Sequence, residues 1–285
     1  MNVIVPKKEK MNKKAIILYI VSISVCVLAV IVVACSQYFG AEELDKILAI
    51  NTNKDIQKKV DEELLIIGFD ELFTNQIDTY KTSVDIKKID DTKDIIYSYY
   101  EKQEKQDNNY DIDICIPFFN IENEALKKYN EAIENDFVKK AENVLQSQNK
   151  NTIYTVQYIA TVEDDILSLM IRSNLKDGSS AQRVIIQTYH FDLRENKVVT
   201  LEEILNKKGI QVAKVEEKVK KQVEEEQKKV EDLKALGYNI FERDLNDDMY
   251  LVKNTEQFFM KNGIIYLIYA YGNEALTSEM DLIII

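Results

Sequence analysis

The stretch QTYHFDLRENKVVTLEEIL, residues 187–205, carries the pattern that decides the fold. Side chains in a β-strand point alternately to opposite faces, so Tyr189 and Phe191 share one face of a predicted strand. His190 and Asp192 share the opposite face, which we expect to be the polar, solvent-exposed one. His190 is the one histidine in the chain. We interpret it and Asp192 as a solvated pair on a strand and not as a catalytic dyad.

The second half of the stretch predicts a turn and the start of a helix. RENK, residues 194–197, interrupts the alternation with four polar residues. Thr200 followed three residues later by Glu203 matches a capping box, in which the two side chains bind each other's backbone N–H groups in the first helical turn. The sequence therefore predicts a strand, a turn and a short capped helix in succession.

The rest of the body mixes strand and helix patterns, which predicts an α+β fold with an antiparallel sheet packed against helices. Alternating or continuous runs rich in Ile and Tyr predict strands, at residues 83–89, 94–102, 110–119, 152–162, 165–173, 256–272 and 279–285. Alternation places Tyr154, Val156 and Tyr158 on one face of their strand, and likewise Leu167, Leu169 and Ile171. The KNG turn at 261–263 divides the run 256–272 into a hairpin.

Apolar residues three and four positions apart predict helices, at residues 41–75, 123–145 and 210–236. The second has one apolar stripe, formed by Leu126, Tyr129, Ile133, Phe137 and Val144. Gly237 ends the third. The valine stripe of the last helix fits a helix lying across a sheet, or a coiled-coil partner.

The N-terminal part predicts a membrane anchor. Residues 15–35 form an uncharged, apolar run of 21 residues, which at about 1.5 Å per residue spans a hydrocarbon core of roughly 30 Å. Residues 1–14 carry five Lys and one Glu, so the positive-inside rule places them in the cytoplasm. We expect a cytoplasmic tail (1–14), a single transmembrane helix (15–35), a membrane-proximal helical segment (36–81) and an extracellular α+β domain (82–285).

Cys35 leaves a second interpretation of the apolar run open. Val32-Val33-Ala34-Cys35 resembles the lipobox of bacterial lipoproteins, in which the cysteine is lipidated and becomes the mature N-terminus. The run is longer than the core of about 7–15 residues in most cleaved signals. In either case the body is tethered to the cell membrane and faces outward.

The charge of the body restricts its partners. The chain has a net charge of −12; residues 1–14 contribute +4 and residues 15–35 contribute nothing, so residues 36–285 carry −16. An acidic body repels the phosphate backbone, which argues against nucleic-acid binding. Complementary charge favours a basic protein as the partner.

The residue types of common catalytic sites are missing. One histidine and no G-x-S-x-G motif argue against a Ser-His-Asp hydrolase, and Cys115 as the only body cysteine argues against zinc. Residues 244–256 begin like a calcium loop but have Met249 where glycine is required and Thr255 in place of the final Glu. We expect no enzyme, no cofactor and no metal, with Cys115 an inert packed thiol. Paired carboxylates of a cell-wall hydrolase stay open as an alternative.

Several segments in this order resemble an extracellular domain shared by two bacterial families. The segments are DIDICIPFF (111–119), LKKYNEAIENDF (126–137), DILSLMIRS (165–173), TYHFDLRENKVVTLEEIL (188–205), FFMKNGIIYLIYAYG (258–272) and DLIII (281–285). They are similar to the outer part of RsiV-type anti-sigma factors, which are lysozyme receptors, and to the non-catalytic region of PdaC-type peptidoglycan deacetylases. The resemblance covers about residues 83–285.

The departures from these families define what the resemblance implies. The tail of 14 residues is too short to fold as a sigma-sequestering domain, and the deacetylase domain with its metal-binding histidines is missing. The ligand loop that often precedes the Tyr-x-Phe-Asp-Leu strand is here KDGSSAQR. The resemblance thus implies a non-catalytic binding or sensing module of the cell envelope, whose ligand is a cell-wall fragment or a lysozyme-like protein. Its candidate binding residues are Asp177, Ser179, Ser180, His190 and Asp192.

Overall fold

The computed structural model describes residues 52–106, 110–146, 151–275 and 277–285. The predicted transmembrane run 15–35, with Cys35, lies outside these residues. Within the described part of the chain, no helix has both the length and the apolar character needed to cross a membrane. The chain divides into two compact units, residues 1–64 and 65–285.

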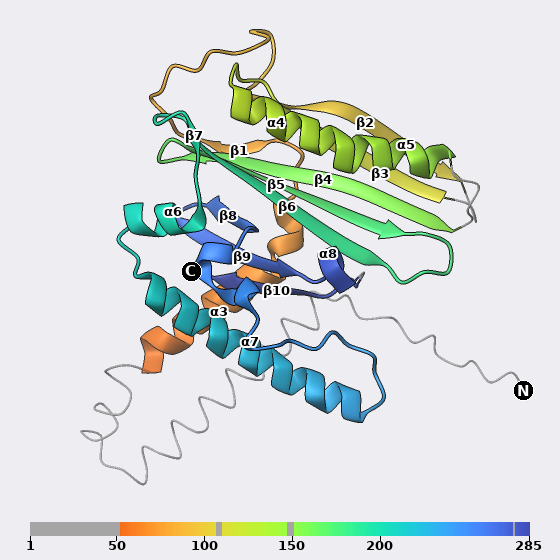
Figure 1. Ribbon diagram of the computed structural model, residues 1–285, viewed down its shortest axis with the longest axis vertical. Coiled ribbons are helices and arrows are strands. Elements are labelled where there is room, and N and C mark those ends of the chain that lie inside the picture. Colours follow the sequence, from red (N-terminus) through yellow and green to blue (C-terminus); the bar gives the residue numbers. More distant parts are fainter. Residues whose placement is uncertain (1–51, 107–109, 147–150, 276) are drawn as a thin grey trace, which may run out of the picture. The chain divides into compact units, whose positions relative to one another are not determined.

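The larger unit contains a seven-stranded sheet, called here the large sheet (Figure 1). Its strands are β1 (Ile77–Tyr80), β2 (Ile96–Gln106), β3 (Tyr110–Phe119), β4 (Thr152–Glu163), β5 (Ile166–Lys176), β6 (Arg183–Asp192) and β7 (Lys197–Val198). Their order is β2-β3-β4-β5-β6-β7, and β1 pairs with β4 beyond the end of β3. The β1–β4 and β3–β4 pairs are parallel and the others antiparallel. This confirms a mixed α+β fold rich in antiparallel strands.

One face of the large sheet is covered by a helical layer. The layer consists of α4 (Glu124–Ile133), a π-helical turn (Glu134–Val138) and α5 (Lys139–Gln146). Asn123 caps α4 by accepting hydrogen bonds from the N–H groups of Ala125 and Leu126. The predicted stripe of the helix enters the core together with Tyr154, Val156 and Tyr158 of β4 and Leu167, Leu169 and Ile171 of β5. These shared faces were predicted from alternation and are confirmed.

The opposite face of the large sheet is covered by a second sheet of three antiparallel strands, called here the small sheet. It contains β8 (Phe258–Lys261), β9 (Ile264–Ala270) and β10 (Met280–Ile284), in the order β10-β9-β8. Ile159, Met170 and Ile186 of the large sheet pack against Phe259, Tyr266 and Ile268 of the small one. Where the small sheet lies on β4, β5 and β6, both faces of the large sheet are therefore buried.

The predicted hairpin at residues 256–272 is confirmed. Asn262 and Gly263 connect β8 and β9 with φ angles of 54° and 77°, the left-handed conformation of the two-residue turns that suit a hairpin. The carboxylate of Glu163 accepts hydrogen bonds from the N–H groups of both turn residues, at 2.6 and 3.0 Å. The turn of the small sheet is thus fastened to the end of β4.

The burial of both sheet faces overturns the expectation for the polar face of β6. Tyr189 and Phe191 pack into the helical side of the core as predicted. The opposite face does not meet water, because the small sheet lies on it. His190 is 4% exposed and Asp192 is 2% exposed. The prediction of a solvated pair was wrong, since alternation alone does not show what covers the second face of a strand.

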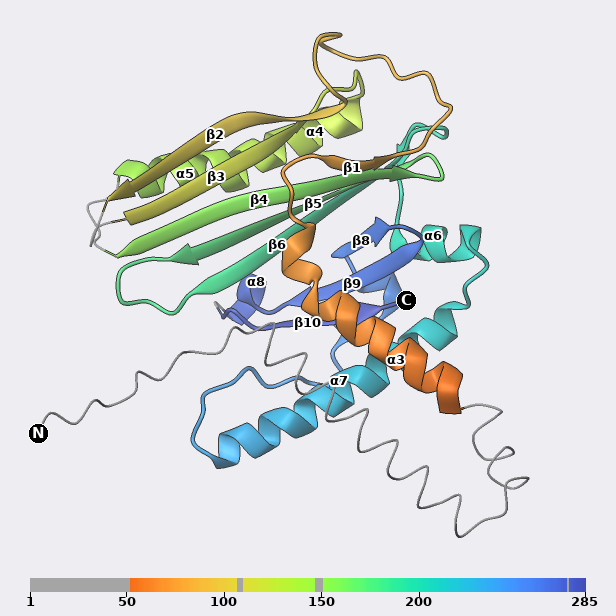
Figure 2. The same cartoon turned by 180° about the vertical axis from the view of Figure 1, so that it is seen from behind.

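The outer face of the small sheet carries a second set of helices (Figure 2). Thr200 and Glu203 form the predicted capping box at the start of α6 (Leu201–Lys207). The long helix α7 (Val212–Ala235) buries Val215, Val219 and Val223 against the small sheet. This confirms a helix lying across a sheet, and Gly237 at φ 90° follows its last turn as predicted.

In the segment before β2 one local prediction was wrong and another is confirmed in part. Residues 83–89 were expected to form a strand, but they have no regular structure. The helix expected over 41–75 is described from Thr52: α3 spans Thr52–Ile67, a 3-10 turn follows at Phe69–Leu72, and β1 begins at Ile77. Phe69 packs in the core between the two sheets. The larger compact unit consequently includes residues 65–81, which the sequence had assigned to the membrane-proximal segment.

The remaining short elements precede β8 or connect β9 to β10. They are two 3-10 turns (Asp248–Tyr250 and Val252–Asn254) and the one-turn helix α8 (Gly272–Ala275). A buried ion pair fastens the loop after α7 to β10. The Arg243 guanidinium donates two hydrogen bonds to the Asp281 carboxylate, both 2.7 Å long, and the Tyr271 hydroxyl donates to the same carboxylate at 2.6 Å.

We predict that Asp281→Asn lowers the free energy of unfolding by about 3–5 kcal/mol, because it leaves a buried guanidinium without its counter-charge. Arg243 and Asp281 are 8% and 7% exposed, so water does not replace the lost partner. Urea unfolding followed by circular dichroism measures the change. The double variant Arg243→Met with Asp281→Leu should lose much less; equal losses in the two proteins would contradict this role of the pair.

Candidate binding groove

The predicted loop residues lie at the tip of the β5–β6 hairpin and bind one another. The Ser180 hydroxyl donates to the Asp177 carbonyl at 2.6 Å, and Thr152 donates to the Asp177 carboxylate at 3.3 Å. Ser179 lies exposed between them. The loop is a closed turn in which the polar groups of Asp177 and Ser180 already have partners within the protein.

Asp192 ends β6 and stabilises the turn that follows. Its carboxylate accepts hydrogen bonds from the N–H groups of Arg194 and Glu195, at 2.9 and 2.7 Å, and pairs with the Lys207 ammonium of α6. Burial alone would raise the pKa of Asp192, but the Lys207 bond and the two N–H groups outweigh it and leave the pKa below its usual value. Its partners assign Asp192 a structural role.

His190 lies at the interface between the two sheets. Its ring stacks on Phe258 of β8 with centroids 3.6 Å apart, and Nδ1 lies 3.1 Å from the Ser168 hydroxyl of β5. Burial lowers the pKa of His190 to about 3, and the nearby backbone of Phe258 offsets only part of this shift. The imidazole is therefore neutral at physiological pH and packed between layers.

The structure does not bring the five predicted binding residues together. Arg183, next to the hairpin tip, and His190 are seven residues apart on one strand. At about 3.3 Å per residue this is roughly 23 Å. The loop residues and the His190–Asp192 pair are thus at opposite ends of β6 and do not form one site.

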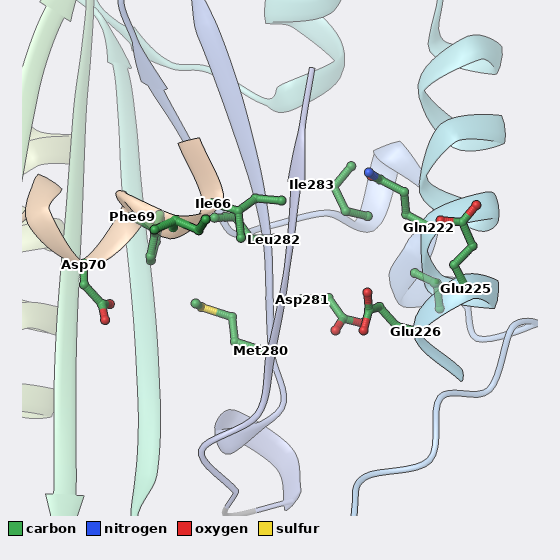
Figure 3. Close-up of a pocket in the computed structure, with 12 residues that line it drawn as sticks. Ile66, Phe69, Asp70, Gln222, Glu225, Glu226, Met280, Asp281, Leu282 and Ile283 are labelled. Carbon is green, nitrogen blue, oxygen red and sulfur yellow. The ribbon is translucent and has the colours of Figure 1, made fainter. Parts of the chain in front are cut away.

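A groove beside β10 is a candidate binding site (Figure 3). Its volume is about 400 Å³. It is bordered by the last residues of α3 and the following 3-10 turn, by β10, and by the middle of α7. Its lining residues are Ile66, Ile67, Phe69, Asp70, Gln222, Val223, Glu225, Glu226, Met280, Asp281, Leu282 and Ile283.

The two walls of the groove differ in chemistry. One wall is largely apolar, with Ile66 and Ile67 exposed by 40% and 72%. The other wall is acidic, because α7 contributes Glu225 and Glu226. Across the lining there are four carboxylates and no Lys or Arg. The groove therefore presents a negative potential next to an apolar surface.

Two of the four groove carboxylates are neutralised by arginines that do not line the groove. Asp70 pairs with Arg172 and Asp281 with Arg243. Glu226 forms an ion pair with the exposed Lys229 ammonium at 2.5 Å, and water screens this interaction. The side-chain oxygen of Gln222 is buried and accepts no hydrogen bond from any described residue. The wall formed by α7 thus offers a hydrogen-bond acceptor that no described residue occupies.

The floor of the groove is the outer edge of β10. Ile285 exchanges both backbone hydrogen bonds with Ile265, at 2.8 and 3.2 Å. Since residues of an antiparallel strand turn their N–H and C=O groups alternately to either side, Asp281 and Ile283 face β9 and Met280 and Leu282 face outward. The N–H and C=O groups of Met280 and Leu282 therefore face the groove.

Sequence patterns carried only a faint signal of this groove. Gln222, Glu225 and Glu226 stand at positions i, i+3 and i+4 and so share one side of α7. The density of Glu and Lys along that helix hides the spacing. Which edge of the small sheet stays open depends on how the sheets pack, which a single strand pattern does not contain.

Metal and thiol chemistry find no support among the described residues. No group of three or more His, Cys, Asp and Glu there could hold a metal ion. Asp244 and Asp247, from the calcium-like stretch, instead accept hydrogen bonds from the N–H groups of Asn246 and Met249. Cys115 is buried as predicted, with its Sγ 3.0 Å from the Ser98 hydroxyl, and burial raises its pKa.

Comparisons with known proteins give structural neighbours but no family. No family model and no curated protein matches the chain. A DUF3298 family protein from Pseudomonas aeruginosa PAO1 has a TM-score of 0.38 and 13% identity, over 71% of this chain and 90% of its own. A DUF3298 family member from Bacteroides fragilis NCTC 9343 has a TM-score of 0.30 and 12% identity, over 61% and 80%. Likenesses at this level carry no conclusion about function.

We predict that the buried His190 makes stability fall in mild acid. Its pKa is about 3 in the folded chain and 6.5 in the unfolded one, so below pH 6.5 only the unfolded chain takes up the proton. Between pH 7 and pH 5 this removes about 2 kcal/mol from the free energy of unfolding. Urea unfolding at the two pH values measures the loss.

His190→Phe is the matched control, because it keeps an aromatic ring on Phe258 and removes the titrating group. Its absolute stability is not the readout; the difference between pH 7 and pH 5 is. That difference should shrink by about 2 kcal/mol relative to the unchanged chain. An undiminished pH dependence would show that His190 is not the group responsible.

Proposed function

We propose that this protein is a non-catalytic binding module of the bacterial cell envelope that captures a basic protein through the groove beside β10. Residues 15–35 anchor it to the cell membrane, and residues 36–285 face outward. A lysozyme-like protein is the partner class that the charge of the body favours. No cofactor or metal takes part.

The observation that supports this proposal is the composition of the groove lining. The lining has four carboxylates and no lysine or arginine, and the amide oxygen of Gln222 has no partner among the described residues. Complementary charge raises the rate of encounter with a cationic protein and discourages acidic competitors. The apolar wall at Ile66 and Ile67 supplies the surface whose burial stabilises a complex.

The arrangement of side chains favours binding over catalysis. The one histidine is neutral and packed between two sheets, and the one body cysteine lies in the core with a raised pKa. Two of the four groove carboxylates are already paired with arginines. A cell-wall hydrolase using paired carboxylates would require a free acid facing a base across a substrate cleft.

The test measures binding of a cationic lysozyme to the full chain in neutral detergent at moderate salt. We expect Glu225→Gln with Glu226→Gln to raise Kd about five- to tenfold, since each lost charge contact contributes up to about 1 kcal/mol. The matched control is Glu131→Gln with Glu134→Gln, which removes the same charge from exposed positions of the helical layer. The control should change Kd less than twofold.

Three results would overturn the proposal. Equal effects of the two double variants would show that the net charge, and not the groove, attracts the partner. A change in the mass profile of soluble muropeptides incubated with the chain would instead establish the alternative, a cell-wall hydrolase. Binding of muropeptides without a change in their mass would show that the ligand is a cell-wall fragment and not a protein.

A further inference from the structure

The small sheet has two edges that differ in how their outward backbone groups are satisfied. At the β8 edge, Phe258 donates its N–H to the Thr188 hydroxyl at 3.2 Å, and the Met260 carbonyl accepts from Thr161 at 2.7 Å. Both threonines belong to the large sheet. The β8 edge is therefore closed by side chains from the neighbouring layer.

No described side chain closes the β10 edge along the groove in this way. Lys218 of α7 donates to the Ile284 carbonyl at 2.6 Å and so closes only the far end. The N–H and C=O groups of Met280 and Leu282 face the groove. Exposed strand edges are templates for the addition of another strand.

We infer that the partner binds as an extended segment that adds a fourth strand to the small sheet beside β10, with basic and apolar residues in alternation. This inference rests on the proposed function and specifies how the groove is used. Main-chain hydrogen bonds to Met280 and Leu282 supply affinity, and the two walls select alternate side chains.

The alternation follows from the two sides of β10. Side chains of Met280 and Leu282 point toward the core between the sheets, where Phe69 packs, and Ile283 points toward α7. An added strand continues this pleat, so its successive side chains meet the two walls in turn. One set meets Ile66 and Ile67, and the other meets Glu225 and Glu226. Figure 3 shows Ile66 on one side of β10 and the two glutamates on the other. The first set must be apolar and the second basic.

A second copy of the chain fits the edge less well. Pairing β10 with β10 would bring two identical surfaces together, and with them the acidic walls of both copies. Like charges placed face to face across an interface oppose association. Charge complementarity thus selects a basic segment over another copy.

The test uses a synthetic acetyl-KVKVKVK-amide peptide and the full chain. Two further peptides are N-methylated, one at every Lys and the other at every Val, so each lacks the N–H groups along one edge. We expect one of the two methylated peptides to bind at least tenfold more weakly than the parent and the other to stay within about threefold. Equal affinity of the two methylated peptides would overturn strand addition.

Variants of the chain separate this inference from the proposed function. Leu282→Pro removes an N–H that faces the groove and leaves the bonds to β9, because proline is tolerated on the open side of an edge strand. The substitution should raise the Kd of the parent peptide about tenfold. If this variant does not fold, the methylated peptides still decide.

Glu225→Gln with Glu226→Gln tests the groove itself. If this variant binds the parent peptide more weakly and the two methylated peptides bind the unchanged chain equally, the proposed function stands and strand addition is refuted. Unchanged affinity in this variant would refute both. Self-association of the chain that competes with the peptide, seen by sedimentation, would assign the edge to a second copy and also refute the inference.

Discussion

The central constraint on this fold is that the strands in the middle of the large sheet must be apolar on both faces. Tyr158 and Leu169 point into the helical side of the core, while Ile159 and Met170 point toward the small sheet. All four side chains are at most 1% exposed. Burial of this kind contributes about 25 cal/mol per Å² of apolar surface. The small sheet is therefore required, because without it one face would be exposed to water.

The small sheet in turn creates the candidate site. It is three strands wide, so it has only two edges, and the large sheet closes one of them through Thr161 and Thr188. The other edge lies between the end of α3 and the middle of α7. Acidic residues of α7 border it, as charged residues border many natural strand edges. Negative charges at this edge repel acidic chains and attract basic ones.

Sequence patterns predicted local elements well and their environment poorly. Alternation identified the core faces of β4, β5 and β6, and the Thr200–Glu203 capping box and the Asn262–Gly263 hairpin were confirmed, because each depends on residues close in sequence. The burial of His190 depends on Phe258, 68 positions away, and no local pattern reports it. The groove residues come from three distant segments for the same reason. Expectations for residues 1–51, including the membrane anchor, lie outside the described part of the chain.

Hydrogen exchange of single backbone amides tests most directly whether the β10 edge is open. In the free chain, the N–H groups of Asp281 and Ile283 point to β9, whereas those of Met280 and Leu282 point to the groove. We expect the amides of Met280 and Leu282 to exchange at least a hundredfold faster than those of Asp281 and Ile283, since only the latter require the sheet to open. Equal, slow exchange of all four amides would show that the edge is already covered and would contradict a binding groove at β10.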